Sequence, residues 1–256
     1  MSNWHGEFAF ATRSLVLKDF RVRYRNMSLG VFWSLLNPLT MMGVLSFVFS
    51  GIFPNPQIKN FPVFILCGLI PFNFFSLAWA SGTSSLLDNT GLIKRLTVPR
   101  EIIPIASVLS NCMHLGIQIS LLLFLVLAAG YGINWYWLWL PLIWGLEVVF
   151  VMGMALACSA LNVYIRDMRY VVESSNTILF WLVPIFYPFS LIPARFSGIY
   201  ELNPIAALVL ATRNVLLDAK APPSTLLWKL SISCILVFLL GWGVFQLLKR
   251  RFYDHL

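Results

Sequence analysis

Long apolar stretches, separated by short polar segments, make up most of the sequence. A helix that crosses the hydrocarbon core of a bilayer needs about 20 predominantly apolar residues. Six stretches approach or exceed that length, so the sequence predicts an all-α membrane protein with six transmembrane helices. They cover approximately residues 31–53, 62–87, 102–129, 138–161, 176–192 and 226–248. Pro184 and Pro188 fall within the fifth stretch and predict a kink there.

The first 30 residues differ from the rest because basic residues interrupt every apolar run. Residues 8–28 have the spacing of an amphipathic helix, with apolar side chains on one side and basic ones on the other. A basic helix with an aromatic face is typical of a membrane interface with anionic lipid. We expect a cytoplasmic interfacial helix in residues 1–30, ahead of a transmembrane domain in residues 31–256; the alternative is a cytoplasmic helix packed on protein. The interfacial candidates are Lys18, Arg21, Arg23, Tyr24 and Arg25.

A second unusual segment, residues 195–224, precedes the last apolar stretch. Its apolar part, Ile205–Leu217, has 13 residues, which is too short to cross a bilayer, and it contains Arg213. We expect short re-entrant helices that enter the outer leaflet without crossing it. An arginine in hydrocarbon costs at least about 2.5 kcal/mol. Arg213, a candidate gate residue, is therefore expected to meet water, lipid phosphates or an acid, of which this segment contains Glu201 and Asp218.

The composition excludes several classes of protein. Hydrophobic residues make up 59% of the chain and charged residues 11%, whereas roughly 25% of the residues in soluble domains are charged. An ordinary soluble enzyme, a disordered chain and a disulfide scaffold are thereby excluded. With the N-terminus inside, 13 of the 18 Lys and Arg residues fall on the inner side of a six-helix topology. This asymmetry predicts that both termini are cytoplasmic, and no nucleic acid partner is expected.

Motifs for catalysis and for metal binding are missing from the sequence. It contains no G-x-x-x-x-G-K-[ST], no H-E-x-x-H, no G-x-S-x-G and no His or Cys residues at metal-ligand spacing. The four cysteines lie far apart in apolar stretches and are interpreted as packing residues. We therefore expect no catalytic residue, metal site or cofactor in this chain.

Polar residues inside the predicted transmembrane helices are candidates for function. Glu147 lies near the middle of the fourth stretch, where it would contact a proton or substrate, or form a hydrogen bond with a neighbouring helix. Polar residues of the third stretch share one helical face, which lines a passage or, more commonly, holds helices together. They are Ser107, Asn111, His114 and Gln118. Gly153 and Ala157 predict a close helix contact, within one subunit or between subunits.

Phenylalanine is unusually abundant, with 21 copies. Aromatic faces bind the apolar planes of sugar rings, and they also pack in protein interiors. Trp181, Phe186 and Tyr187, in the fifth stretch, are therefore candidates for a channel lining as well as for packing.

Several segments, in a fixed order along nearly the whole chain, resemble the permease subunits of ABC transporters that export polysaccharides. The first segment, residues 19–38, contains the family pattern at Arg23, Tyr24, Leu29, Gly30, Trp33 and Pro38. The others are residues 92–101 (LIKRLTVPRE) and 162–170 (NVYIRDMRY), similar to cytoplasmic loops, and residues 201–206 with 213–217, similar to external re-entrant helices.

This resemblance implies a homodimer of six-span subunits in the bacterial cytoplasmic (inner) membrane, with a translocation path between them. It implies two separate ATPase subunits, which carry the ATP and magnesium, and a lipid-linked polysaccharide substrate such as O antigen, capsule or teichoic acid. Motion of the ATPase would reach the membrane through residues 88–101, the interfacial helix and residues 162–170. The basic residues of 88–101 also fit ordinary positive-inside topology. The coupling candidates are Lys94, Arg95, Leu96, Pro99, Arg100 and Glu101.

Three alternatives belong to other functional classes. A related ABC permease would export a drug or haem. An ATP-independent flippase usually has inverted halves, which the sequence does not show. A membrane enzyme acting on lipid-linked sugar needs an acid pair or a nucleophile, which is not found.

Overall fold

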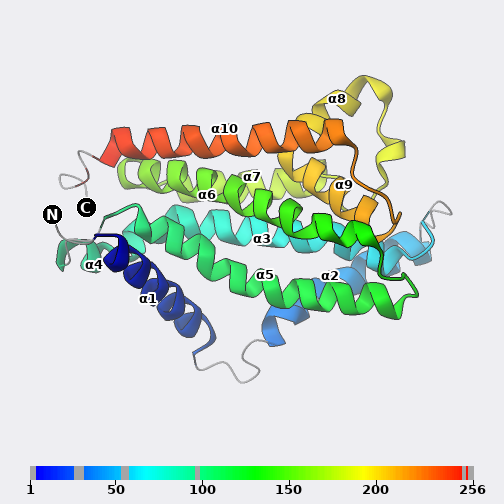
Figure 1. Ribbon diagram of the computed structural model, residues 1–256, viewed down its shortest axis with the longest axis horizontal. Helices are drawn as coiled ribbons and strands as arrows, with labels where there is room; N and C mark the ends of the chain where they lie inside the picture. Colours follow the sequence, from blue (N-terminus) through cyan, green and yellow to red (C-terminus); the bar gives the residue numbers. More distant parts are fainter. Residues whose placement is uncertain (1–3, 26–31, 53–57, 96–98, 250–251, 253–256) are drawn as a thin grey trace.

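The computed structural model describes residues 4–25, 32–52, 58–95, 99–249 and 252. Every regular element in these ranges is a helix, and the long helices run side by side along the length of the molecule (Figure 1). An all-helical chain agrees with the sequence prediction, because a helix satisfies its own backbone hydrogen bonds where lipid offers none.

Within the described ranges, five helical stretches are long and apolar enough to cross a membrane. They correspond to five of the six stretches predicted from the sequence. They are α2 (Trp33–Ser46) continued by the π-helix η2 (Phe47–Ile52), α3 (Phe61–Asp88), α5 (Ile102–Ala128), the 3-10 helix η3 (Trp135–Trp139) continued by α6 (Leu140–Tyr164), and α10 (Ser224–Lys249).

The fifth predicted stretch, residues 176–192, does not form one kinked helix. Helix α7 (Met168–Leu182) begins eight residues earlier and ends before Pro184, where Val183 is extended at φ −71° and ψ 137°. A residue that precedes proline avoids the helical region, and proline supplies no backbone N–H, so the helix ends here instead of bending. A short 3-10 helix, η4 (Phe189–Leu191), follows.

Two short helices, α8 (Ala194–Leu202) and α9 (Pro204–Leu216), precede α10. Asn203 caps α9, because its side chain accepts a hydrogen bond from the Ile205 backbone N–H at 3.1 Å, and Pro204 occupies the first turn. Helix α9 has 13 residues and lies against α3, α6 and α10. The segment therefore contains short helices, as expected, and their re-entrant placement in the membrane stays a prediction.

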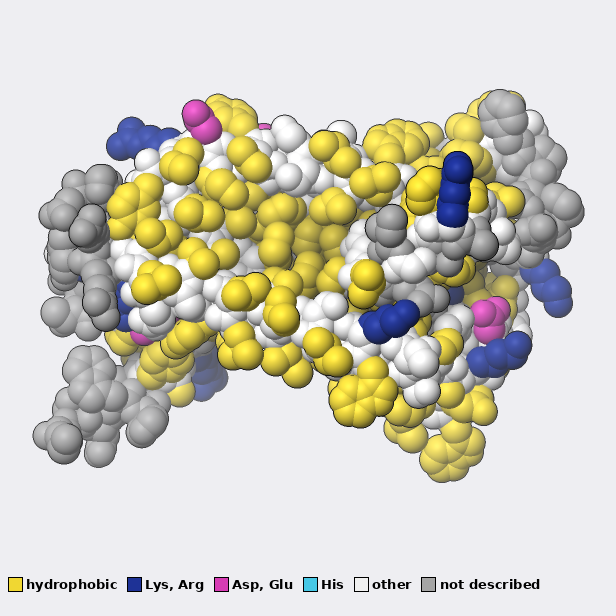
Figure 2. Space-filling view, turned by 90° about the horizontal axis from the view of Figure 1, so that it is seen from above, with side chains coloured by type: hydrophobic (Ala, Val, Ile, Leu, Met, Phe, Trp, Pro, Cys, Tyr) yellow, Lys and Arg dark blue, Asp and Glu magenta, His cyan; other side chains and the backbone are white. Residues whose placement is uncertain are grey.

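The two ends of the bundle differ in what they carry. Helix α1 (Trp4–Tyr24) begins near the end of α10, and the short helix α4 (Thr90–Arg95) lies at the same end, called the terminal end below (Figure 1). Helices α8 and α9 lie at the opposite end, called the α9 end. Figure 2 shows an apolar surface between the ends on one face of the molecule, with charged side chains towards both ends, which is the surface expected of a membrane protein.

Helix α3 is the centre of the packing. It contacts α2, α5, α6, α7 and α9, and its side chains Ile65, Leu66, Phe74 and Phe75 are fully buried. Gly82 of α3 faces Ala155 of α6, and Gly153 of α6 faces Gly241 of α10 so closely that a Cβ atom on Gly153 would lie 2.6 Å from Cα of Phe238. The close contact predicted at Gly153 is therefore made within the subunit.

Candidate functional site

Helix α1 covers Trp4–Tyr24, whereas the sequence predicted a helix over residues 8–28; residues 26–31, including Leu29 and Gly30, lie outside the described residues. It packs against α5. The side chains of Arg21 and Arg25 are exposed, whereas those of Arg23 and Tyr24 lie outside the description. The contact with α5 fits the alternative of a helix packed on protein, and the interfacial role stays a prediction.

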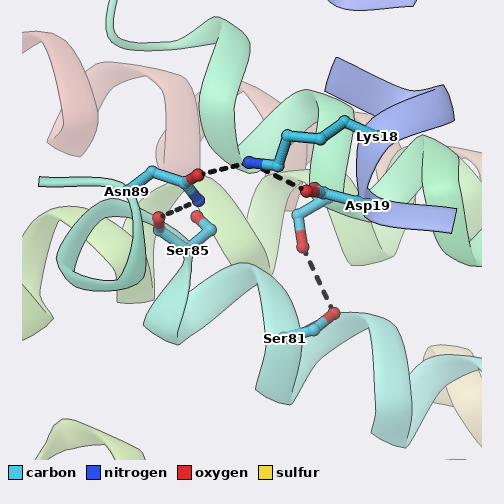
Figure 3. Close-up of polar contacts among 6 residues, drawn as sticks. Lys18, Asp19, Ser81, Ser85 and Asn89 are labelled. Carbon is cyan, nitrogen blue, oxygen red and sulfur yellow. Dashed lines mark hydrogen bonds and ion pairs between the residues drawn. The ribbon is translucent and has the colours of Figure 1, made fainter. Parts of the chain in front are cut away.

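Lys18 joins α1 to the terminal end of α3. Its Nζ donates to Oδ1 of Asn89 at 2.8 Å and lies 3.3 Å from the carboxylate of Asp19 (Figure 3). Asn89 follows α3 and precedes α4, and its side-chain amide donates to the Ser85 carbonyl at 2.9 Å. One side chain therefore links α1 to the junction between α3 and α4.

A polar cavity of about 380 Å³ lies between α1, α3 and α5. Its lining consists almost entirely of hydroxyl, amide and charged side chains. The residues are Lys18, Asp19, Val22, Ser81, Ser84, Ser85, Asp88, Asn89, Ser107 and Ser110. Figure 3 shows Lys18 and Asp19 extending from α1 towards this region. The surfaces of α3 and α5 that face α1 across this cavity are therefore polar.

The coupling candidates in α4 and in the segment after it are only partly within the described residues. Lys94 is exposed on α4. Arg95 ends that helix, with its side chain outside the description, and Leu96 lies outside the described residues altogether. Pro99 begins the turn into α5, since its carbonyl accepts from the Ile102 N–H at 3.1 Å. Among the basic coupling candidates whose side chains are described, Lys94 is exposed to solvent and Arg100 is buried.

Arg100 and Glu101 contact the end of α10 instead. The Arg100 side chain is buried, donates to the Lys249 carbonyl at 3.2 Å and faces the Phe252 ring at 5.7 Å. The Glu101 carboxylate accepts a hydrogen bond from Lys249 Nζ at 2.7 Å. These two residues connect the start of α5 to the end of α10. Sequence reasoning missed Lys249 because it begins the basic run 249–251, which resembles ordinary topological charges, and it missed Phe252 because nothing marks that residue as a partner of Arg100.

The polar face of α5 is buried and bonds to neighbouring helices. Asn111 Nδ2 donates to the Ser81 hydroxyl of α3 at 2.8 Å. Gln118 Nε2 donates to the Ser34 carbonyl of α2 at 3.1 Å and lies 3.0 Å from Nε2 of His114. Such contacts hold helices together, which is the more common of the two roles considered for this face.

Glu147 of α6 is almost completely buried, with 1% of its surface exposed. Among the described residues neither carboxylate oxygen has a hydrogen-bond partner. The bond to a neighbouring helix that the sequence offered as one alternative is therefore not present there. An unpaired buried charge is costly, so this carboxyl group is either neutral or paired with a group outside the described residues.

An aromatic cluster surrounds the end of α7. The Phe186 ring lies 5.3 Å from those of Trp181, Tyr187 and Phe49, and Tyr187 donates its hydroxyl to the Leu182 carbonyl at 2.7 Å. Trp181 is 59% exposed, whereas Phe186 and Tyr187 are half-buried. The cluster therefore packs η2 against the α7 end and presents one indole outward.

Arg213 is buried and bonds to backbone carbonyls. Its guanidinium donates to Pro184 at 2.6 Å, to Ile185, and to Phe64 at 3.3 Å, and it lies 3.5 Å from the centre of the Phe64 ring. The expectation that it meets water, phosphates or an acid is thus replaced by three carbonyls and a ring. Burial lowers the pKa of the Arg213 guanidinium to about 9, which leaves it charged at neutral pH. The side chain of Glu201 lies outside the description.

The helices define the class of the molecule as a multi-pass membrane protein. A family model described as ABC-2 type transporter matches residues 11–217. The chain therefore belongs to the ABC-2 type transporter family, which confirms the resemblance recognised in the sequence.

Characterised relatives align with nearly the whole chain. The O-antigen export system permease protein RfbA of Klebsiella pneumoniae is 30% identical, over 93% of this chain and 91% of the relative. The RfbA protein of Myxococcus xanthus is 26% identical, over 94% and 93%. The polysialic acid transport protein KpsM of Escherichia coli is 24% identical, over 91% of each chain. These relatives are membrane subunits of transporters.

Proposed function

We propose that this chain is the transmembrane subunit of an ATP-driven ABC exporter that moves lipid-linked polysaccharide, O antigen in particular, across the cytoplasmic membrane. The observation that carries the proposal is similarity to O-antigen export permeases over more than nine-tenths of the chain. The fold supports the proposal. The long apolar helices would form the membrane part of a transport subunit, and α1 and α4, at the terminal end, would be available to a cytoplasmic partner.

The proposed topology has six crossings with both termini in the cytoplasm. Helix α7 has 15 residues, which is about 22 Å at 1.5 Å per residue. The non-helical residues 183–188, of which Val183 and Pro188 are extended, would complete this crossing, the fifth along the chain. Helices α8 and α9 would then lie at the outer surface, where α9 enters the outer leaflet and returns. The terminal end is thereby cytoplasmic, in agreement with the distribution of Lys and Arg.

The proposed assembly is a homodimer of this chain with two ABC ATPase subunits, which bind the ATP and magnesium. Helix α4 would contact the ATPase through Lys94 and Arg95, and α1 would lie at the inner membrane surface. Trp181, with its exposed indole, is the strongest candidate to face the substrate path. Phe186, Tyr187 and the unpaired Glu147 are further candidates.

Complementation tests the proposed function. The chain and its ATPase are expressed in a strain that makes O antigen but lacks its own export permease, and surface polysaccharide is measured with an O-antigen antibody on intact cells. We expect surface display that is lost when the P-loop lysine of the ATPase is replaced. Display of polysialic acid alone, in a parallel strain lacking its capsule permease, would assign the chain to capsule export instead. Display in neither strain would contradict the proposal.

Cysteine accessibility tests the topology. The native Cys67, Cys158 and Cys234 are buried, whereas Cys112 is half-buried, so the labelling background for membrane-impermeant maleimide is a chain with Cys112→Ser. Lys220→Cys should react in intact cells, whereas Gly91→Cys should react only after permeabilisation. Reaction of Gly91→Cys in intact cells would contradict a cytoplasmic terminal end.

A further inference from the structure

A second cavity, of about 430 Å³, lies at the α9 end of the molecule. Its walls come from four segments that are distant in sequence: the start of α3, the loop after α5, the residues around η4 and the end of α9. They contribute Ile58, Lys59, Asn60, Phe64, Tyr131, Pro188, Phe189, Leu210, Arg213, Asn214, Leu217 and Asp218. Its volume lies within the range of roughly 300–1,000 Å³ that is typical of small-molecule sites.

The lining combines aromatic rings with hydrogen-bonding side chains. Phe64, Tyr131 and Phe189 supply flat apolar surfaces, whereas Asn214 and Asp218 supply an amide and a carboxylate. A sugar ring needs this combination, because its C–H face packs on an aromatic plane and its hydroxyl groups need donors and acceptors on the rim.

The wall formed by α9 is rigid. The Leu217 N–H and the Asp218 N–H both donate to the Arg213 carbonyl, at 2.8 and 3.2 Å, and the Lys220 N–H donates to the Asn214 carbonyl at 2.9 Å. Ala219 adopts the left-handed conformation at φ 48°, as is common just after a helix. The backbone that carries Asn214 and Asp218 is therefore fixed by hydrogen bonds.

Arg213 provides evidence that the cavity is a built site. Its side chain is only 5% exposed and is fixed by three carbonyls and the Phe64 ring. The charged side chain is therefore fixed in the cavity lining before any ligand binds.

We propose that this cavity binds one monosaccharide unit of the exported polymer at the outer end of the permease. The inference rests on the proposed function and adds a specific subsite to it. A sugar fits better than a phosphate, because Asp218 places a carboxylate in the same cavity as Lys59 and Arg213. The ligand is therefore a neutral or weakly acidic sugar.

Photo-crosslinking in exporting cells tests the subsite. The photoreactive residue p-benzoylphenylalanine replaces Tyr131 in the full chain with its ATPase, and Phe189 in a second variant in case the first is not produced. Tyr136→p-benzoylphenylalanine is the matched control, since this tyrosine is five positions away, 40% exposed and not part of the lining. After illumination, the tagged permease is isolated and probed with the O-antigen antibody.

We expect a polysaccharide-linked ladder from position 131 or 189 at least five times stronger than from position 136. Asn60→Trp should weaken the ladder, because a larger ring at the cavity mouth competes with the sugar, whereas Lys220→Trp, outside the lining, should leave it unchanged. Equal ladders at 131 and 136, or no ladder at 131 and 189 while the cells display polysaccharide, would overturn the subsite but leave the proposed function intact. If the unsubstituted chain supports no display, the proposed function itself fails.

Discussion

The Glu101 carboxylate, at the start of α5, accepts a hydrogen bond at 2.7 Å from Lys249 Nζ, at the end of α10. The two side chains are 13% and 31% exposed, respectively, so the pair is partly shielded from water. The contact closes the terminal end of the bundle, where Arg100 also bonds to the Lys249 backbone. Glu101 therefore links α5 to α10 within the subunit, and a contact with the ATPase would have to form beside this bond or replace it.

Replacement of Glu101 should affect stability before it affects coupling. Glu101→Lys places two ammonium groups together and should lower the melting temperature of the detergent-purified permease by about 2–4 °C for each kcal/mol lost. The double variant Glu101→Lys with Lys249→Glu should recover most of this loss, because the pair is restored with its charges exchanged. No recovery in a thermal unfolding series would contradict a stabilising pair.

Replacement of Lys94 should affect coupling to the ATPase and leave stability unchanged. The side chain is exposed on α4, so Lys94→Glu should leave the melting temperature unchanged but reduce stimulation of the ATPase by the permease several-fold. Lys94→Arg keeps the charge and serves as the control. Normal ATPase stimulation with Lys94→Glu would remove this residue from the proposed interface.

The contact between α6 and α10 should tolerate no added methyl group at Gly241. The Cβ of Gly241→Ala would overlap the Gly153 backbone, so we expect a loss of at least about 1–3 kcal/mol, the usual cost of overpacking. Gly243→Ala is the control two residues away, since nothing among the described residues lies within 4 Å of its Cβ position. Thermal unfolding of both variants side by side checks the prediction, which fails if they melt together.

Arg213→Ala should lower membrane abundance and polysaccharide display together. The change leaves the Pro184 and Ile185 carbonyls without their donor, and hydrogen bonds to charged groups contribute about 1.5–3 kcal/mol each. Quantitative blotting alongside surface staining separates the outcomes, with Lys220→Ala as an exposed control. Lost display at normal abundance would instead make Arg213 a gate residue.

The bond between Lys18 and Asn89 should hold α1 against the bundle. Lys18→Met removes an exposed hydrogen bond worth about 0.5–1.5 kcal/mol, so amide exchange in α1 should become several-fold faster without a change in α3. Arg21→Met, at an exposed position of the same helix, is the matched control. Equal exchange in both variants, measured by mass spectrometry in nanodiscs, would contradict this role.

The family, the membrane class and five of the long helices could be predicted from the sequence. The thickness of a bilayer sets the length of an apolar stretch, and a helix in lipid bonds within itself, so both properties are local. The break between α8 and α9 also depends on neighbouring residues in the sequence, since Asn203 caps α9 and Pro204 occupies its first turn. The end of α7 before Pro184 was partly accessible, because the prolines predicted a kink, although the hydropathy favoured one helix over residues 176–192.

The partners of the polar residues could not be predicted. Glu101 and Lys249 are separated by 148 positions, and Arg213 and Phe64 by 149. An apolar pattern indicates that a helix is buried, but it does not identify the neighbour that a particular side chain meets. The sequence by itself therefore determined the class, the family and the long helices. Only the tertiary structure placed Arg100 and Glu101 on α10, bonded Arg213 to carbonyls and formed the cavity at the α9 end, because these depend on how distant helices pack.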